Sequence, residues 1–210
     1  MGTREITICR RLCFAGIIGV IFYVLHDIIG AKNYPGYDWM SQAVSDLTAT
    51  DAPSFAVAKG FSGIHGVMCI VCVLFVYVLA QRKHKLTRIG IAFFTAMEMI
   101  STIGYSLFPL SGAGYDGSVQ SFIHVYVITV AVVLLSIVSL VLISIGAKKD
   151  NMKFLSIAAI VALALMFVGA IGSQAVPKEY FGILERFSTY SATMFCALLG
   201  INFGIEKMAP

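Results

Sequence analysis

The sequence predicts an all-α membrane protein: a bundle of six transmembrane helices with a short interfacial helix in the first outer loop. The chain is 59% hydrophobic and only 12% charged, about half the charged share of a soluble domain. Six long apolar stretches fill most of it, and about 20 apolar residues cross the hydrocarbon core as a helix. Membrane strands are shorter and alternate in polarity, so they do not explain these runs. A single domain, residues 1–210, is therefore expected.

The first three spans are expected at residues 12–29, 54–80 and 89–108. The first follows a basic start like that of a signal peptide, but no small-residue cleavage site comes after it, so a retained span is predicted. Asp51 and Pro53 supply the cap and first turn of the second span. Gly60, Gly63 and Gly66 recur on that span and predict a groove for close helix packing.

The last three spans are expected at residues 122–146, 154–173 and 188–205. His124 lies at the outer start of the fourth, and a basic turn separates the fourth from the fifth. Glu185 and Arg186 precede the sixth span, where an acidic side chain suits the positive end of a helix. The connections are too short to separate two domains.

Most basic residues fall on one side of this layout, and these are Arg4, Arg10, Arg11, Arg82, Lys83, Lys85, Arg88, Lys148, Lys149, Lys153 and Lys207. The other side holds only Lys32, Lys59, Lys178 and Arg186. The positive-inside rule then predicts a protein of the plasma (cytoplasmic) membrane with both termini in the cytoplasm. The net charge of +4 reflects this topology. No nucleic-acid partner is predicted, because the basic residues form no folded face.

The first outer loop, residues 30–53, is the longest connection. Its Tyr and Trp residues suit the headgroup layer of the membrane. Met40, Val44 and Leu47 share one helical face, which predicts a short interfacial helix lying over the bundle.

Polar and titratable residues gather at the outer ends of the spans. Such groups are costly near hydrocarbon and usually face a cavity or a partner. The sequence therefore predicts an outward-opening polar pocket built from His26, Asp27, Ser41, Ser45, Asp46, His65, His124, Glu185 and Arg186. In the alternative interpretation each residue bonds separately to a loop or to water. Arg186 is either an anion-binding group or part of a surface pair with Glu185 or Asp46.

No cofactor is predicted, and two are weighed. Zinc has candidate ligands in His65, His124 and Asp46, but no HExxH motif or paired His fixes a site. Haem between His65 and His124 is disfavoured, because bis-His membrane cytochromes usually carry more matched histidines. Ser41 and Ser45 are conceivable nucleophiles without a defined geometry. The spacing of Cys69 and Cys72 suits redox chemistry, but thiols in mid-membrane usually act as small apolar groups.

Glu98 is an intramembrane acid, about ten residues into the third span and near the bilayer midplane. No Lys or Arg lies at that depth. One interpretation is a proton or cation site of a transporter. The other is a neutral carboxylic acid bonded to Ser101, Thr102 or a facing carbonyl.

Several segments resemble the domain of unknown function 998 family of six-span membrane proteins. The strongest is the stretch from Tyr34 to Leu47, which contains Ser45-Asp46-Leu47, and others are Phe108-Pro109, His124 and the stretch from Gly182 to Arg186. The family brings no established activity. A more distant likeness to Frag1/DRAM-type proteins, which have a similar Ser-Asp element, implies a role around membrane lipids. The zinc hydrolases related to ceramidases and adiponectin receptors have a seven-span layout and His spacing that this chain does not match.

Together these patterns predict a pocket, covered by residues 30–53, that binds a membrane lipid headgroup or a small amphiphilic ligand from the outer leaflet. Two alternatives stay open: a metal-dependent membrane hydrolase using His65, His124 and Asp46, and a proton-coupled transporter using Glu98. A purely structural role is a third. Neither enzymatic activity nor oligomeric state follows from the sequence.

Overall fold

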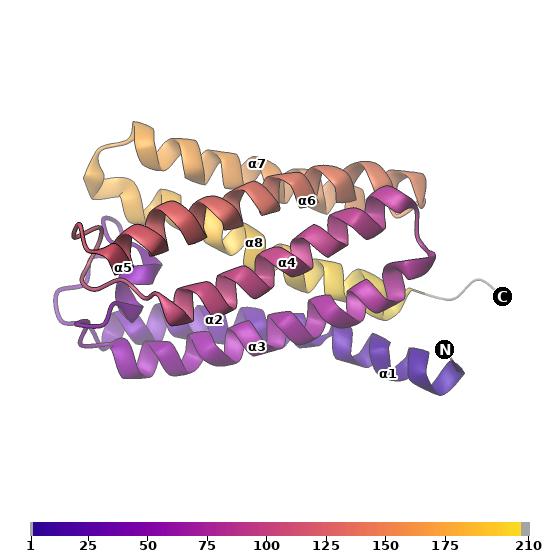
Figure 1. The fold of residues 1–210 in the computed structure, drawn as a ribbon, viewed down its shortest axis with the longest axis horizontal. Helices are drawn as coiled ribbons and strands as arrows, with labels where there is room; N and C mark the ends of the chain where they lie inside the picture. Colours follow the sequence, from indigo (N-terminus) through magenta and orange to yellow (C-terminus); the bar gives the residue numbers. More distant parts are fainter. Residues whose placement is uncertain (1, 207–210) are drawn as a thin grey trace.

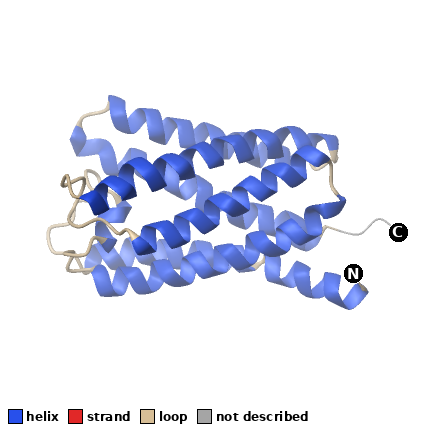
Figure 2. Ribbon diagram, viewed as in Figure 1, coloured by secondary structure: helices blue, strands red, loops and turns tan. Residues whose placement is uncertain are grey.

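The computed structural model describes residues 2–206, and within them every regular element is helical, as Figures 1 and 2 show. Six helical segments are long and apolar enough to cross a membrane. They comprise α1 (Thr3–Cys13) with α2 (Ala15–Lys32), α3 (Phe55–Leu79), α4 (Lys85–Leu107), α5 (Val119–Phe122) with α6 (Thr129–Lys149), α7 (Lys153–Ala175) and α8 (Phe181–Ile205). The six-helix prediction is confirmed.

Most of the helices extend beyond the expected spans, because hydropathy detects only their apolar part. At the last helix, α8 begins before residue 188, the expected start of the span. A 3-10 turn, Lys178–Tyr180, leads directly into α8 at Phe181. Glu185 and Arg186 therefore lie inside the helix, on its second turn, and their positions are fixed by its geometry. Lys207, counted above among the basic residues, lies outside the described residues.

The predicted interfacial helix is shorter than expected. Only Val44–Thr48 is helical, as a single 3-10 turn. Val44 and Leu47 are buried, so the turn inserts its apolar side between α2 and α3 instead of lying over the bundle. The Ser54 hydroxyl donates to Leu47 O at 2.8 Å and fixes the turn to the start of α3.

Helix α8 contacts α1, α2, α3 and α7, and α3 likewise contacts four helices. Phe94 and Phe195 pack edge to face in the core, with ring centroids 5.2 Å apart. The predicted glycine groove is wrong in part. A Cβ at Gly60 or Gly63 would meet nothing within 4 Å, and only Gly66 lies against another helix, at Thr102 of α4. Gly200 makes a closer contact than Gly66, because it lies against Cys13 O and Cys72 Sγ.

The two ends of the bundle differ. Figure 1 shows the α2–α3, α4–α5 and α7–α8 connections at one end, and the start of α1 and the end of α8 at the other. At the latter end Asp150 accepts hydrogen bonds from His84 N at 2.9 Å and Thr87 Oγ1 at 2.5 Å, which tie two basic connections together. The end with the polar residues is called the outer end below.

We expect Gly200→Ala to lower the free energy of unfolding by about 1–3 kcal/mol, the usual cost of overpacking. The new methyl group would collide with Cys13 O and lie 2.6 Å from Cys72 Sγ. Thermal unfolding in detergent measures the change. Gly63→Ala is the matched control, because its methyl group meets nothing within 4 Å. Equal midpoints for both variants would contradict the packing described here.

Candidate functional site

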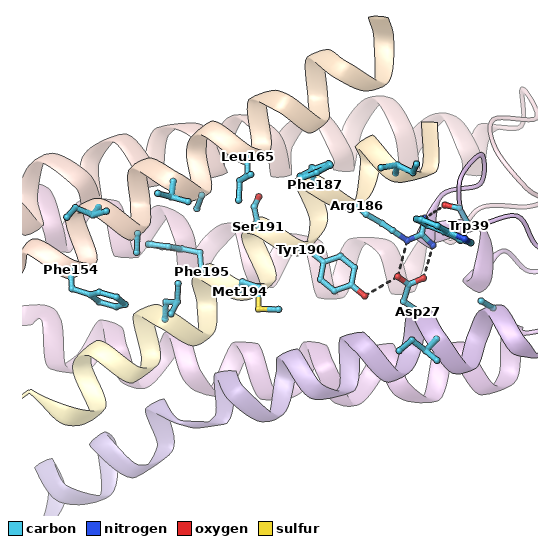
Figure 3. A pocket seen from close by; sticks show the side chains of 18 residues that line it. Asp27, Trp39, Phe154, Leu165, Arg186, Phe187, Tyr190, Ser191, Met194 and Phe195 are labelled. Carbon is cyan, nitrogen blue, oxygen red and sulfur yellow. Dashed lines mark hydrogen bonds and ion pairs between the residues drawn. The ribbon is translucent and has the colours of Figure 1, made fainter. Parts of the chain in front are cut away.

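An ion pair joins α2 to α8 at the outer end. Arg186 binds Asp27 with two hydrogen bonds, from Nη2 to Oδ1 at 2.7 Å and from Nε to Oδ2 at 3.0 Å. Tyr190, one turn further along α8, donates its hydroxyl to Asp27 Oδ2 at 3.0 Å. Both charged side chains are only 12% exposed. Figure 3 shows the three side chains meeting between the helices.

The same guanidinium holds the first outer loop. Nη1 donates to Trp39 O at 2.8 Å, Gln42 O at 3.1 Å and Gly182 O at 3.0 Å. Nη2 donates to the Tyr37 hydroxyl at 2.9 Å. All five N–H groups of the guanidinium thus have acceptors within the protein. The partner of Arg186 is Asp27 rather than Glu185 or Asp46, the partners predicted for a surface pair.

Glycine at position 182 makes this arrangement possible. A Cβ there would lie 2.6 Å from Trp39 O and would collide with Gln42 O. The loop carbonyls therefore approach α8 closely enough to reach Arg186 only because residue 182 has no side chain.

Tyr37 and Asp46 hold the rest of the loop. Burial raises the pKa of Tyr37 above its usual range, and its neutral hydroxyl donates to Ala43 O at 2.8 Å. Asp46 accepts from Ala43 N at 3.1 Å and from Gly114 N at 2.9 Å, which joins the first outer loop to the α4–α5 connection. Desolvation raises the pKa of Asp46, although these hydrogen bonds oppose the shift. Glu185 accepts from Val44 N at 3.3 Å.

The three outer histidines each bind a backbone carbonyl of a different segment. Nδ1 of His26 lies 3.0 Å from Ala58 O, that of His65 2.9 Å from Gly19 O, and that of His124 2.8 Å from Phe108 O. A carbonyl oxygen only accepts, so Nδ1 carries the donated proton in each ring. The histidines therefore link α2 to α3 and the start of the fourth span to the end of α4.

Tyr23 brings part of the predicted pocket together. Its ring centroid lies 5.8 Å from that of His26, 4.9 Å from that of His65 and 5.1 Å from that of Tyr190. His26, Asp27, His65, Glu185 and Arg186 thus share the region between α2, α3 and α8.

The other predicted residues lie apart from this cluster. His124 stacks on Tyr105, with centroids 4.6 Å apart. Ser41 donates to Asp38 Oδ2 at 2.8 Å, and Ser45 is half-buried next to Asp46 in the 3-10 turn. Among residues 2–206, His65, His124 and Asp46 do not form a group with ligand atoms close enough for one metal ion.

An elongated apolar groove begins at the ion pair. It has a volume of ≈ 980 Å³ and runs between α2 and α7 over α8, from Trp39 and Arg186 to Phe154 at the opposite end. Figure 3 shows Leu165, Phe187, Met194 and Phe195 along its length. Side chains that line it, such as Ile157 and Val161, are 61% and 50% exposed, so the groove opens to the surroundings of the helices.

Sequence reasoning missed Tyr23, Tyr37, Trp39 and Tyr190 as members of this region. For Tyr190 a signal existed, because it follows Arg186 by four residues and so shares its helix face. The groove itself had no such signal, since its walls combine α2 and Trp39 with α7 and α8, which are distant from them in sequence.

A family model described as "Protein of unknown function (DUF998)" matches residues 17–202 of the chain. The match covers all six helical segments. No curated protein and no solved structure matches the chain.

We expect Asp27→Asn to lower the free energy of unfolding by about 3–5 kcal/mol, because Arg186 would keep a buried charge without a counter-ion. The released loop should also become more sensitive to protease. Adding Arg186→Met should recover part of the loss, since it removes that charge. Thermal unfolding and protease cleavage within residues 30–53 measure both effects, with the exposed Lys178→Gln as control. A silent Asp27→Asn would contradict this role of the ion pair.

Proposed function

This chain belongs to the DUF998 family, and we propose that it binds a membrane lipid or a similar amphiphile in the groove between α2, α7 and α8. It is a multi-pass membrane protein. The observation that carries the proposal is an apolar groove of ≈ 980 Å³ with a single polar end. That volume is at the upper end of the range of small-molecule sites, about 300–1,000 Å³. One polar end and one long apolar body match the shape of an amphiphile.

The dimensions of the groove support an acyl chain as the apolar part. Along α8 the lining runs from Ile183 to Leu198, which at the rise of a helix is about 22 Å. One leaflet of the hydrocarbon core is about 15 Å thick. The groove is therefore longer than a leaflet, and its exposed rim on α7 gives a chain lateral access from the bilayer.

The polar end favours an uncharged headgroup. Arg186 has no N–H left for a phosphate, and its charge is balanced by Asp27. Three groups remain to bind a headgroup by hydrogen bonds. They are the hydroxyl oxygen of Tyr190, the carboxylate of Asp27 and the indole N–H of the half-exposed Trp39. These groups suit hydroxyls or carbonyls, such as those of a glycerol or sugar headgroup.

We further propose that both termini are cytoplasmic, so that the polar end of the groove lies in the outer leaflet. The start of α1 and the end of α8 lie with the basic connections, opposite the polar cluster (Figure 1), and such connections are typical of the cytoplasmic side.

Labelling of single added cysteines tests this orientation. All five native cysteines are buried, whereas Lys178 and Lys148 are exposed at opposite ends of the bundle. We expect a membrane-impermeant maleimide to label Lys178→Cys in intact cells and Lys148→Cys only after lysis. The opposite pattern would invert the orientation.

Filling the groove should abolish lipid binding. We expect Val161→Trp to reduce co-purified lipid, measured by native mass spectrometry, at least tenfold. Val168→Trp is the matched control on the same helix, because Val168 is 51% exposed, against 50% for Val161, but does not line the groove. A monoacylglycerol added to delipidated protein should bind at least tenfold more tightly than a lysophosphatidic acid with the same acyl chain.

Three results would count against the proposal. Equal lipid retention by the two tryptophan variants would remove the groove as the binding site. Tighter binding of the lysophosphatidic acid would contradict the uncharged headgroup. A dimer that is lost only in Val161→Trp would identify the groove as an interface between two copies of the chain.

A further inference from the structure

We propose that Cys69, Glu98 and Cys196 form a binding site for Zn²⁺ in the middle of the bundle. The site is separate from the groove and uses none of the ligands predicted for zinc from the sequence. The three ligand atoms come from α3, α4 and α8 and all lie within 4.8 Å of one another. In the described part of the chain, no other group of three His, Cys, Asp or Glu residues meets this criterion.

The separations suit a single small ion after a modest adjustment. Zinc binds sulfur at about 2.3 Å and carboxylate oxygen at about 2.0–2.2 Å in tetrahedral geometry. Ligand atoms around one ion are therefore about 3.3–3.8 Å apart. From the 4.8 Å within which the ligand atoms lie, they would close by about 1 Å to bind one ion.

Burial and the missing partners of Glu98 point to a ligand. Cys69 and Cys196 have no exposed surface, and Glu98 is 6% exposed. No hydrogen bond or ion pair joins the Glu98 carboxyl group to another residue of the described chain, and its expected partners Ser101 and Thr102 do not fill that role. Its oxygens keep some accessible surface, since Ser136 Oγ is the one fully buried side-chain oxygen or nitrogen without a partner in the described chain. A bound cation would give the carboxyl group the partner that it lacks.

The site lies near the middle of the bundle, where a carboxyl group without a hydrogen-bond partner costs the most free energy. Cys69 lies about 21 Å from the outer end of α3 and Cys196 about 22 Å from that of α8, near the middle of both helices. Space for the sulfur of Cys69 is left by a glycine of the neighbouring helix, since a Cβ at Gly19 would lie 2.8 Å from it. The thiol is thus held against α2 and directed towards the other two ligands.

The donor set selects the ion. Thiolate and carboxylate together match Zn²⁺, whereas Mg²⁺ and Ca²⁺ require all-oxygen sites. The three groups bind the ion in deprotonated form, as two thiolates and one carboxylate. Each thiol releases its proton as it binds. With three protein ligands the fourth coordination position remains open, as in catalytic rather than structural zinc sites.

His65 supports the site from one turn above. Its Nδ1–H donates to Gly19 O and lies 3.6 Å from Cys69 Sγ. This places a hydrogen-bond donor beside the ligating sulfur, the usual role of an outer-shell residue. His65 is half-buried and lies nearer the outer end than Cys69.

Metal titration of purified protein in detergent tests the proposal. We expect one Zn²⁺ per chain by elemental analysis after removal of free metal, and a Co²⁺ derivative with thiolate-to-metal absorption. Cys69→Ser, Cys196→Ser and Glu98→Gln should each weaken binding by more than the 10–100-fold typical of outer-shell changes, and His65→Ala should weaken it within that range. Cys9→Ser is the matched control, because Cys9 is also buried but lies outside the group.

A folding defect is recognised separately by measuring the thermal unfolding midpoint of each variant without metal. Added Zn²⁺ should then raise the midpoint of the wild type and of Cys9→Ser, and should leave the midpoints of the three ligand variants unchanged. The proposal is overturned if the wild type binds no stoichiometric metal, or if the three ligand variants bind Zn²⁺ as the wild type does. It is also overturned if mass spectrometry finds Cys69 and Cys196 as a disulfide in protein that binds no metal. None of these results bears on the lipid groove.

Discussion

The arrangement of the outer end depends on the need to neutralise one buried charge. Arg186 sits on a membrane helix at 12% exposure, where an unpaired guanidinium would cost several kcal/mol. The protein meets this need with Asp27 and with three carbonyls and a tyrosine hydroxyl. Because those acceptors come from α2, α8 and the first outer loop, neutralising the charge also fixes the three segments relative to one another. The polar end of the groove is a consequence of this arrangement.

Elsewhere in the bundle, neutral polar groups fix neighbouring segments relative to one another. Each outer histidine donates to a backbone carbonyl of another segment, at His26, His65 and His124. In lipid the hydrophobic effect does not drive helices together, so interhelical hydrogen bonds and close packing replace it. The histidines that suggested a shared metal or haem site are therefore accounted for as contacts between helices. Their Nε2 atoms remain available, but the rings are held in place by the carbonyls.

Helix α8 separates the two proposed sites. Phe187, Tyr190 and Met194 face the groove beside α2 and α7, whereas Cys196 faces α3 and α4 at the centre of the bundle. One face thus lines the groove proposed for lipid, and the other encloses the thiol–carboxylate group. Chemistry at Cys196 and amphiphile binding at Tyr190 are consequently independent in space, although both sites depend on the position of the same helix. The Asp27–Arg186 pair, which fixes the outer end of α8, is the physical link between them.

Local sequence properties determined the class of this protein and the order of its helices. Continuous apolar runs and the clustering of basic residues depend only on neighbouring residues, and they predicted six helices with the polar residues at one end. The partners of those residues were decided by tertiary structure, because Asp27 and Arg186 are 159 positions apart and no local pattern favours Asp27 over Asp46. Tertiary structure likewise decided that Cys69, Glu98 and Cys196 lie together. In a hydropathy profile they are two apolar residues and one isolated charged residue. Their proximity comes from the crossing of three helices, and helix crossings depend on small contacts such as Gly19 and Gly200, which composition and periodicity do not encode.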